Sequence, residues 1–214
     1  MHKERYLTSE NAEEKVNFWL SSLAGARGRR KVIFGQHSGR SAALLVIDMQ
    51  RYFTHADSHA FVPSVDVALQ NINRLVECFN TELVVYTRHI DAENSIMLKW
   101  WESGLFKDNP LSEIDARIKL RGKVVSKHTY SAFYKTKLET LLKKNHIERV
   151  YITGLLTNLC CETTARDAFV HGYEVFLIAD ATATYNEQLH FATLLNLSHG
   201  FARVVSTKEV LGGK

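Results

Sequence analysis

Short apolar runs alternate with segments of helical periodicity along most of this 214-residue chain, and this alternation restricts the possible folds strongly. The runs lack the apolar–polar alternation of a half-exposed strand, as expected for parallel strands buried on both faces of a sheet. We therefore expect an α/β fold, a doubly wound, Rossmann-like three-layer sandwich with helices on both faces of a six-stranded, mostly parallel sheet. The expected strands are residues 42–47, 83–87, 123–126, 150–153, 174–179 and 201–205, and the expected helices after the first strand are residues 64–80, a segment ending at 144, 157–171 and 187–198.

The chain divides into a helical extension, residues 1–40, and a main domain, residues 41–214. An amphipathic helix is predicted at residues 9–24, and Asn11 with Glu14 has the spacing of a capping box at its start. The apolar face of this helix must be covered, either by the domain or by a second subunit. The sequence leaves both arrangements open.

Composition excludes several classes of function. The formal charge of +4 is small for this length, and the basic, glycine-containing stretch at residues 25–31 lacks the strand and the Gly-Lys-Ser/Thr of a phosphate loop. We interpret that stretch as a solvated linker. No apolar run of the sequence approaches the ~20 residues that span a bilayer, and three cysteines, two of them adjacent, form no disulfide framework. We therefore expect a cytoplasmic protein that binds neither nucleic acid nor membranes, with Cys78 as a small core residue.

Chemically useful side chains stand at the carboxyl ends of the expected strands. Asp48, Arg88 and Lys127 each end or directly follow a strand, and Cys160 lies in or next to the first turn of the helix after the fourth strand. In a doubly wound sheet these ends converge on one crevice. A helix N-terminus favours a thiolate, and a carboxylate and an ammonium beside the thiol can take its proton and hold the resulting charge. The residues alone therefore predict a cysteine hydrolase.

Alternatives remain for individual residues. Asp48 can cap the following segment instead of serving a site. Arg88 suits bidentate binding of a substrate carboxylate, but a structural ion pair is equally consistent with its position. His55 and His59 have a spacing that a metal can use in a helix, yet the segment is not helical and no third ligand is evident, so we interpret them as solvated.

The walls of the site are expected to come from loops. Residues 91–122 form a long, weakly patterned segment that we expect to cover the site, since such stretches seldom build a core layer. Phe53, Trp100 and Tyr130 are predicted as the substrate-contacting walls, with Arg88 for an anionic group. We expect a small-molecule substrate, no cofactor, no metal and a homo-oligomer, dimer or tetramer.

Six segments resemble the isochorismatase-like cysteine hydrolases, and together they cover about residues 42–211. They are LLVIDMQRYF (44–53), VVYTRH (84–89), VVSKHTYSAF (124–133), ITGLLTNLCCETTARDAF (152–169), GYEVFLIADATAT (172–184) and ARVVSTKEVL (202–211). The resemblance implies that Cys160 is the nucleophile, Asp48 its base and Lys127 the electrostatic support. It also implies a non-proline cis peptide at Leu155-Leu156, with the amides of Leu156 and Cys160 forming the oxyanion hole.

The family contains several activities, and two local features separate them. Nicotinamidases carry an Asp-x-His pair after the second-strand arginine and bind a metal there, whereas this chain reads His89-Ile90-Asp91, which disfavours a nicotinamidase. True isochorismatases typically have glycine at the nucleophile position, where this chain has Cys160. A thiolate suits attack on a carbonyl carbon, so we favour cleavage of an amide or ureido C–N bond through a thioester. An isochorismatase-type vinyl ether hydrolase, a nicotinamidase-like amidase and a non-catalytic binding protein remain the alternatives.

Overall fold

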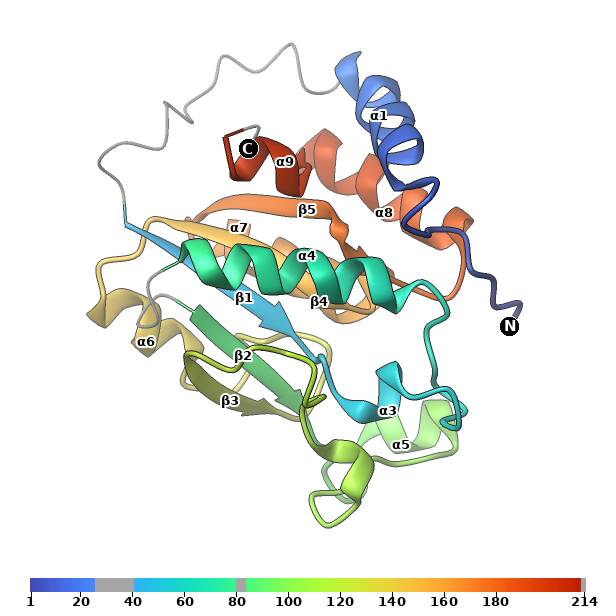
Figure 1. Ribbon diagram of the computed structural model, residues 1–214. Helices are drawn as coiled ribbons and strands as arrows, with labels where there is room; N and C mark the ends of the chain where they lie inside the picture. Colours follow the sequence, from blue (N-terminus) through green and yellow to red (C-terminus); the bar gives the residue numbers. More distant parts are fainter. Residues whose placement is uncertain (26–40, 80–83, 213–214) are drawn as a thin grey trace.

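The computed structural model describes residues 1–25, 41–79 and 84–212, and its centre is a parallel sheet of six strands in the order β3-β2-β1-β4-β5-β6 (Figure 1). Every strand pairing is parallel. This confirms the predicted doubly wound fold. Most of the predicted linker (residues 26–31) and Leu83 lie outside the described residues. The strands are β1 (Ala42–Ile47), β2 (Val84–His89), β3 (Lys123–Lys127), β4 (Arg149–Leu155), β5 (Glu174–Ala183) and β6 (Arg203–Val205).

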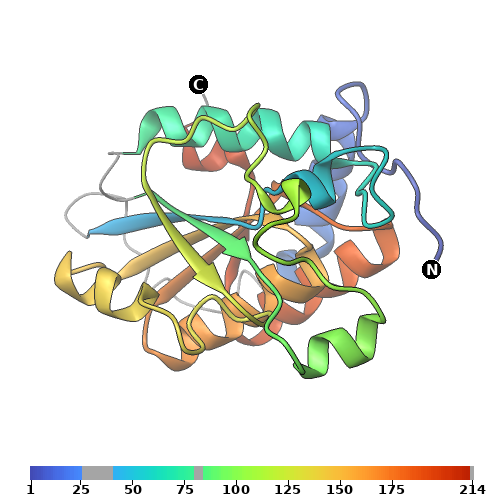
Figure 2. The same cartoon turned by 90° about the horizontal axis from the view of Figure 1, so that it is seen from below.

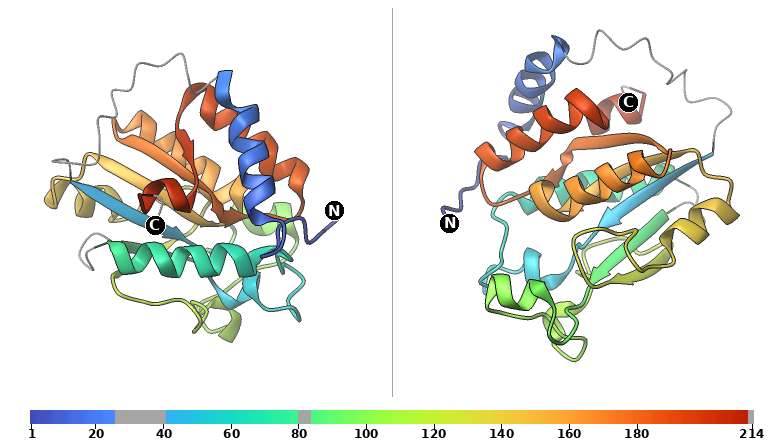
Figure 3. Two further views of the ribbon diagram at one scale, coloured as in Figure 1. Left: turned by 45° about the horizontal axis from the view of Figure 1, so that its top comes forward. Right: turned by 180° about the vertical axis from the view of Figure 1, so that it is seen from behind.

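Helices cover both faces of the sheet (Figures 1 and 2). Helices α4 (Val65–Cys78) and α9 (Thr207–Val210) lie on one face. Helices α6, α7 and α8 lie on the other, as the view from behind shows (Figure 3). The elements not yet bounded are α1 (Ala12–Ser22), α3 (Arg51–Thr54), α5 (Ile96–Trp101), α6 (Leu138–Lys144), α7 (Glu162–Val170), α8 (Glu187–Gly200) and the single turns η2 (Pro110–Ser112) and η3 (Thr157–Cys161).

Strand β1 shows why these runs are apolar throughout. Leu44 and Val46 belong to the hydrophobic cluster beneath α4, whereas Ala43, Leu45 and Ile47 belong to the cluster beneath α6, α7 and α8. All five side chains are fully buried. Since each face of the strand meets a helix layer, neither face tolerates polar residues.

Helix α1 packs on the domain of its own chain, which answers the question the sequence left open. Trp19 is fully buried, its indole N–H donates to Glu187 Oε1 over 3.0 Å, and its ring lies 4.7 Å from that of His190 on α8. The predicted capping box is wrong. Asn11 makes no side-chain capping bond, because its Oδ1 accepts from the backbone N–H of Thr8 instead.

Two local features differ from the sequence prediction. The segment after β4 begins with the wide turn η3, and helix α7 starts only at Glu162, so Cys160 lies in the turn that leads into the helix. Cys78, expected in the core, is exposed because it occupies the last position of α4, beyond the apolar face of that helix. In the part of the chain that the structure describes, no helix is long and apolar enough to cross a membrane.

Candidate active site

Asp48, Lys127 and Cys160 meet at the carboxyl edge of the sheet. Lys127 Nζ lies 2.6 Å from Asp48 Oδ2 and 3.3 Å from Cys160 Sγ, so its ammonium bridges the two. Asp48 follows β1, Cys160 lies in η3 after β4, and these two strands are neighbours where the strand order reverses. Ligand sites of doubly wound sheets form at this switch point. The predicted convergence of the three residues is therefore present.

The backbone and a neighbouring strand hold Asp48 in place. Its φ of 47° lies in the left-handed region, so the backbone leaves the extended conformation of β1 at this residue. Thr87 on β2 donates its hydroxyl hydrogen to Asp48 Oδ1 over 2.6 Å, and the same hydroxyl oxygen accepts from the Asp48 backbone N–H over 3.0 Å. Thr87 was not predicted as a site residue, although a fully buried polar residue within an apolar strand is a signal for one.

Burial and the lysine charge act on the thiol in opposite directions. Burial raises the pKa of Cys160 to about 12, while the Lys127 ammonium opposes that rise. Burial also acts to lower the pKa of Lys127, but the charges of Asp48 and Cys160 outweigh it and raise that pKa to about 12. Burial thus favours the protonated form of the Cys160 thiol, while the neighbouring negative groups favour the charged form of Lys127.

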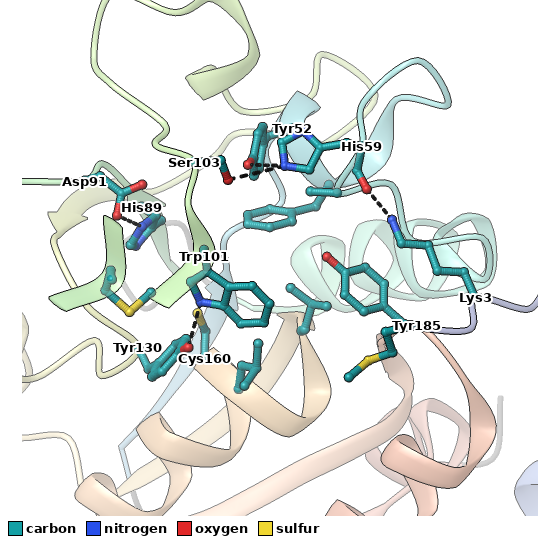
Figure 4. Close-up of a pocket in the computed structure, with 16 residues that line it drawn as sticks. Lys3, Tyr52, His59, His89, Asp91, Trp101, Ser103, Tyr130, Cys160 and Tyr185 are labelled. Atoms are coloured by element: carbon teal, nitrogen blue, oxygen red, sulfur yellow. Dashed lines mark hydrogen bonds and ion pairs between the residues drawn. The ribbon is translucent and has the colours of Figure 1, made fainter. Parts of the chain in front are cut away.

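A cavity of about 250 Å³ opens above Cys160 (Figure 4). Aromatic side chains form much of its wall, and they come from four separate segments of the chain. Such a cavity suits a small ligand with a planar, apolar body. Its lining residues are Met1, Lys3, Tyr52, Phe53, His59, Ala60, His89, Asp91, Met97, Trp101, Ser103, Tyr130, Leu156, Leu159, Cys160 and Tyr185.

Two of the three predicted wall residues line this cavity. Phe53 and Tyr130 are among its lining residues, and the Tyr130 hydroxyl accepts from the indole N–H of Trp101 over 2.9 Å. Trp100 does not line it. This residue is 73% exposed, because the turn of α5 directs Trp101 inward and Trp100 outward. The segment 91–122 covers the site as expected, through Asp91, α5 and Ser103.

Arg88 does not reach the cavity, and the predicted role in binding a substrate anion is wrong. Its Nε donates to the Ser112 carbonyl over 2.9 Å, and its Nη2 lies 2.7 Å from Glu113 Oε1. The guanidinium is thus occupied by the segment that covers the site. The alternative interpretation, a structural ion pair, describes this residue.

The predicted oxyanion residues also lie at the cavity. Leu156 and Cys160 both line it, and the peptide bond between Leu155 and Leu156 is cis, as the family resemblance implied. The carbonyl of Leu156 accepts from the backbone N–H groups of Leu159 and Cys161 over 3.1 and 3.2 Å. These bonds fix the short segment that carries both predicted oxyanion amides.

A histidine and an aspartate face each other in the cavity wall. His89 Nε2 lies 3.0 Å from Asp91 Oδ1, and Asp91 Oδ2 accepts from the backbone N–H of Leu105 over 2.8 Å. Burial opposes ionisation of Asp91, but the bonds from His89 and Leu105 outweigh it and lower its pKa. Because these two side chains bind each other, and no three His, Cys, Asp or Glu side chains cluster suitably within the described residues, this donor set does not fit a metal.

Several cavity residues were not anticipated from the sequence. Lys3 belongs to the N-terminal segment, Tyr185 follows β5, and His59 accepts or donates a hydrogen bond with the Tyr52 hydroxyl over 2.9 Å. Tyr52 lies within a motif that already pointed to the site. Lys3 and Tyr185 carry no such signal, since only the folded chain brings the two segments together.

A doubly wound sheet that joins an aspartate, a lysine and a cysteine at its switch point defines a class of enzyme, the cysteine hydrolases of α/β fold. The chain belongs to the isochorismatase family. The family model, described as the Isochorismatase domain, matches residues 42–209. This confirms the family that the six sequence segments indicated.

Individual proteins agree with this membership. Nicotinamidase 3 of Arabidopsis thaliana is 40% identical over 182 residues, which are 81% of this chain and 88% of that protein. Enterobactin synthase component B of Escherichia coli (strain K12) is 30% identical over 79% of this chain, and the chain spans 62% of that protein's length. The crystal structure of a cysteine hydrolase from Pseudomonas syringae pv. phaseolicola 1448A matches with a TM-score of 0.76 at 26% identity, covering 80% of this chain and 91% of that one.

Proposed function

We propose that this protein is an amidohydrolase that cleaves the C–N bond of a small amide or carbamoyl compound through a thioester on Cys160. The observation that carries the proposal is the Lys127 ammonium, which is bonded at once to Asp48 and to Cys160, a residue that lines an aromatic cavity. A nucleophile, a proton acceptor and a fixed positive charge are the groups that acyl transfer to sulfur requires.

The first half of the reaction forms the thioester. Burial raises the pKa of the Cys160 thiol, which favours a protonated sulfur before the substrate binds. As the sulfur attacks the carbonyl carbon, its proton passes to Asp48, while the amides of Leu156 and Cys160 stabilise the oxyanion. Asp48 then gives the proton to the departing nitrogen, and the C–N bond breaks to release ammonia or an amine.

The second half returns the free enzyme. Water attacks the thioester carbonyl, Asp48 takes a proton from that water, and the C–S bond breaks to leave the carboxylic acid. The sulfur recovers a proton from Asp48. Lys127 keeps its positive charge throughout and stabilises whichever of Asp48 and Cys160 is negative at each stage.

A planar primary carboxamide of the nicotinamide type is the substrate we propose to test first. The cavity is small and has aromatic walls, which suit a flat ring. A relative of 40% identity bears the name nicotinamidase. The order of His89 and Asp91 disfavoured a nicotinamidase. The relationship to that relative supports the nicotinamidase-like alternative.

The variant Cys160→Ala tests the proposal. We expect it to lower the release of ammonia from the amide by at least about 1,000-fold without loss of folding, because it removes the nucleophile alone. The matched control is Cys161→Ala, since Cys161 is an adjacent, fully buried cysteine outside the cavity lining and should leave turnover nearly unchanged. Acid quenching during turnover, followed by mass spectrometry, should find an acyl adduct on Cys160.

Two outcomes would overturn this assignment. Full turnover of isochorismate by Cys160→Ala would favour the vinyl ether hydrolase, in which Asp48 alone transfers the proton. Absence of both turnover and adduct in the natural enzyme, across primary amides and carbamoyl compounds, would favour a binding protein that keeps the fold.

We further propose that the protein acts in the cytoplasm as a homo-oligomer, a dimer or a tetramer. A reducing compartment protects a thiol nucleophile from oxidation, and Cys78, Cys160 and Cys161 are all free thiols. Sedimentation equilibrium of the purified protein at micromolar concentration tests the oligomeric state. A mass equal to one chain would contradict it.

A further inference from the structure

The N-terminal segment, residues 1–7, lies outside the region matched by the family model, yet it reaches the candidate active site. The match begins at residue 42, whereas Met1 and Lys3 both line the cavity above Cys160. Figure 4 shows Lys3 on the other side of the cavity from Cys160. The shared domain therefore does not by itself complete the wall of this cavity.

Hydrogen bonds on two sides fix the path of this segment. The backbone N–H of Glu4 donates to the Tyr185 carbonyl over 2.8 Å, and that of Leu7 donates to Ser64 Oγ over 3.1 Å. Leu7 and Tyr6 are buried, with exposed fractions of 1% and 5%. The segment is thus held between the loop before α4 and the end of β5, and its position at the cavity follows from these contacts.

Lys3 brings a positive charge to the cavity without a carboxylate to neutralise it. Its ammonium donates to the His59 carbonyl and lies 4.3 Å from the centre of the Tyr185 ring. Among the residues that the structure describes, no carboxylate forms an ion pair with it. An ammonium has three N–H groups, so one backbone carbonyl leaves donors for a ligand.

We propose that residues 1–7 complete the substrate site of their own chain and that Lys3 donates a hydrogen bond to an acceptor on the end of the substrate remote from the amide. This rests on the proposed function, which places the amide carbon at Cys160. The far end of a small planar substrate then approaches the wall where Lys3 lies. The acceptor is a ring nitrogen or a carboxylate, and Lys3 selects substrates that carry one over those that do not.

The test compares Lys3→Met with Arg5→Met on three amides. Nicotinamide carries a ring nitrogen, maleamate carries a carboxylate, and benzamide has neither. Methionine keeps an aliphatic chain against Tyr185, so we expect KM to rise about tenfold for the amide whose acceptor Lys3 binds, with kcat and the KM for benzamide nearly unchanged. Arg5 is a matched control, because it lies on the same segment but outside the cavity lining and pairs with Asp66 at 3.3 Å.

Lys3→Arg should restore part of the lost affinity, since it keeps a charged donor. If Lys3→Met raises KM more for nicotinamide, the acceptor is the ring nitrogen. If it raises KM more for maleamate, the acceptor is the carboxylate. Equal losses on all three amides would show a structural role and overturn the inference, as would no change on any of them.

A binding measurement separates this inference from the proposed reaction. In the Cys160→Ala background, calorimetry with nicotinate, maleate and benzoate should show that Lys3→Met weakens the two ligands bearing a second acceptor more than benzoate. That result would support Lys3 even if no amide were hydrolysed. Identical weakening of all three ligands, or no binding of any, would overturn it.

Discussion

Lys127 is a cation with no exposed surface, and this is costly for the folded protein. Its ammonium is balanced by the equally buried Asp48 at 2.6 Å and donates to the Thr129 carbonyl over 2.9 Å. A buried ion pair loses so much hydration that apolar residues in its place are often as stabilising or more so. The pair is therefore better explained by the chemistry proposed for Cys160 than by stability.

This explanation predicts a specific pattern of stabilities. Lys127→Met leaves the Asp48 carboxylate buried without its counter-charge, and we expect a loss of about 3–5 kcal/mol in the free energy of unfolding at pH 7. The double variant Asp48→Asn/Lys127→Met removes both charges and should be more stable than Lys127→Met alone. Urea denaturation of the single and double variants measures this coupling. The single variant Asp48→Asn completes the comparison, and losses that simply add would contradict the coupling. All three variants should lack turnover.

At this scale the sequence predicted the residues whose place follows from strand ends. The convergence of Asp48, Lys127 and Cys160 was predicted because parallel strands end at one edge of the sheet, and the structure brings the three side chains together. Arg88 obeyed the same rule and was still misassigned, since its partners Ser112 and Glu113 come from a loop without a readable pattern. A position at a strand end therefore predicts the edge of the sheet at which a residue lies, but not the group to which its side chain binds.

The geometry of the candidate site depends on the close contact between strands β1 and β4. Gly154 pairs with Ile47, one residue before Asp48, and its φ is +107°. A Cβ at this position would lie 2.0 Å from the Ile47 carbonyl oxygen, which is backbone and cannot move aside. The register of β4 against β5 also shifts between Ile152 and Gly154. Glycine here lets the two strands approach and turns the chain toward η3.

Gly154→Ala should therefore destabilise the protein by more than about 4 kcal/mol or prevent folding. Gly172→Ala is the matched control, because Gly172 also has a positive φ of +89° but a Cβ added there would meet nothing within 4 Å. That control should lose about 1–3 kcal/mol from backbone strain alone. Thermal and urea unfolding of the two variants make the comparison. Equal losses would mean that strain, and not the contact with Ile47, determines the requirement for glycine.

Hydrophobic patterning predicted elements better than it predicted their ends. The six strands and the helices α4, α6, α7 and α8 were predicted from apolar runs and periodicity, since burial on one or both faces leaves a regular apolar pattern in the sequence. The short helices α3, α5 and α9 were not predicted. The wide turn at Thr157–Cys161 was not predicted, and the capping bond predicted at Asn11 is absent. Both depend on local hydrogen bonds that several backbone paths satisfy equally well, and tertiary contacts choose among them.

In the molecule as a whole, the N-terminal residues and the turn that carries Cys160 meet at His190. This residue of α8 is fully buried, and its Nδ1 lies 3.0 Å from the hydroxyl of Thr157 in η3. Its ring lies 5.4 Å from that of Tyr6 and 4.7 Å from that of Trp19. The extension is thus packed through His190 against the turn that carries Cys160.

His190 also links the stability of the whole chain to pH. Burial lowers its pKa to about 3, whereas a histidine in an unfolded chain titrates near 6.5. Above about pH 6.5 both states are neutral at this residue and it adds no pH dependence. Between about pH 6.5 and 3 the unfolded chain binds a proton that the folded chain does not, so stability falls as pH falls through this window.

Because of this pKa difference, we expect the free energy of unfolding to fall between pH 7 and pH 5 by about 2 kcal/mol more in the natural protein than in His190→Gln. Glutamine does not titrate and keeps a polar group beside Thr157, so the change isolates the proton. His199→Gln is the control, because it makes the same replacement at an exposed position of the same helix. Urea unfolding of the three proteins at the two pH values measures the effect. Parallel losses in the natural protein and His190→Gln would mean that His190 is protonated in the folded state as readily as in the unfolded one, and that the contact between the extension and η3 is open to water.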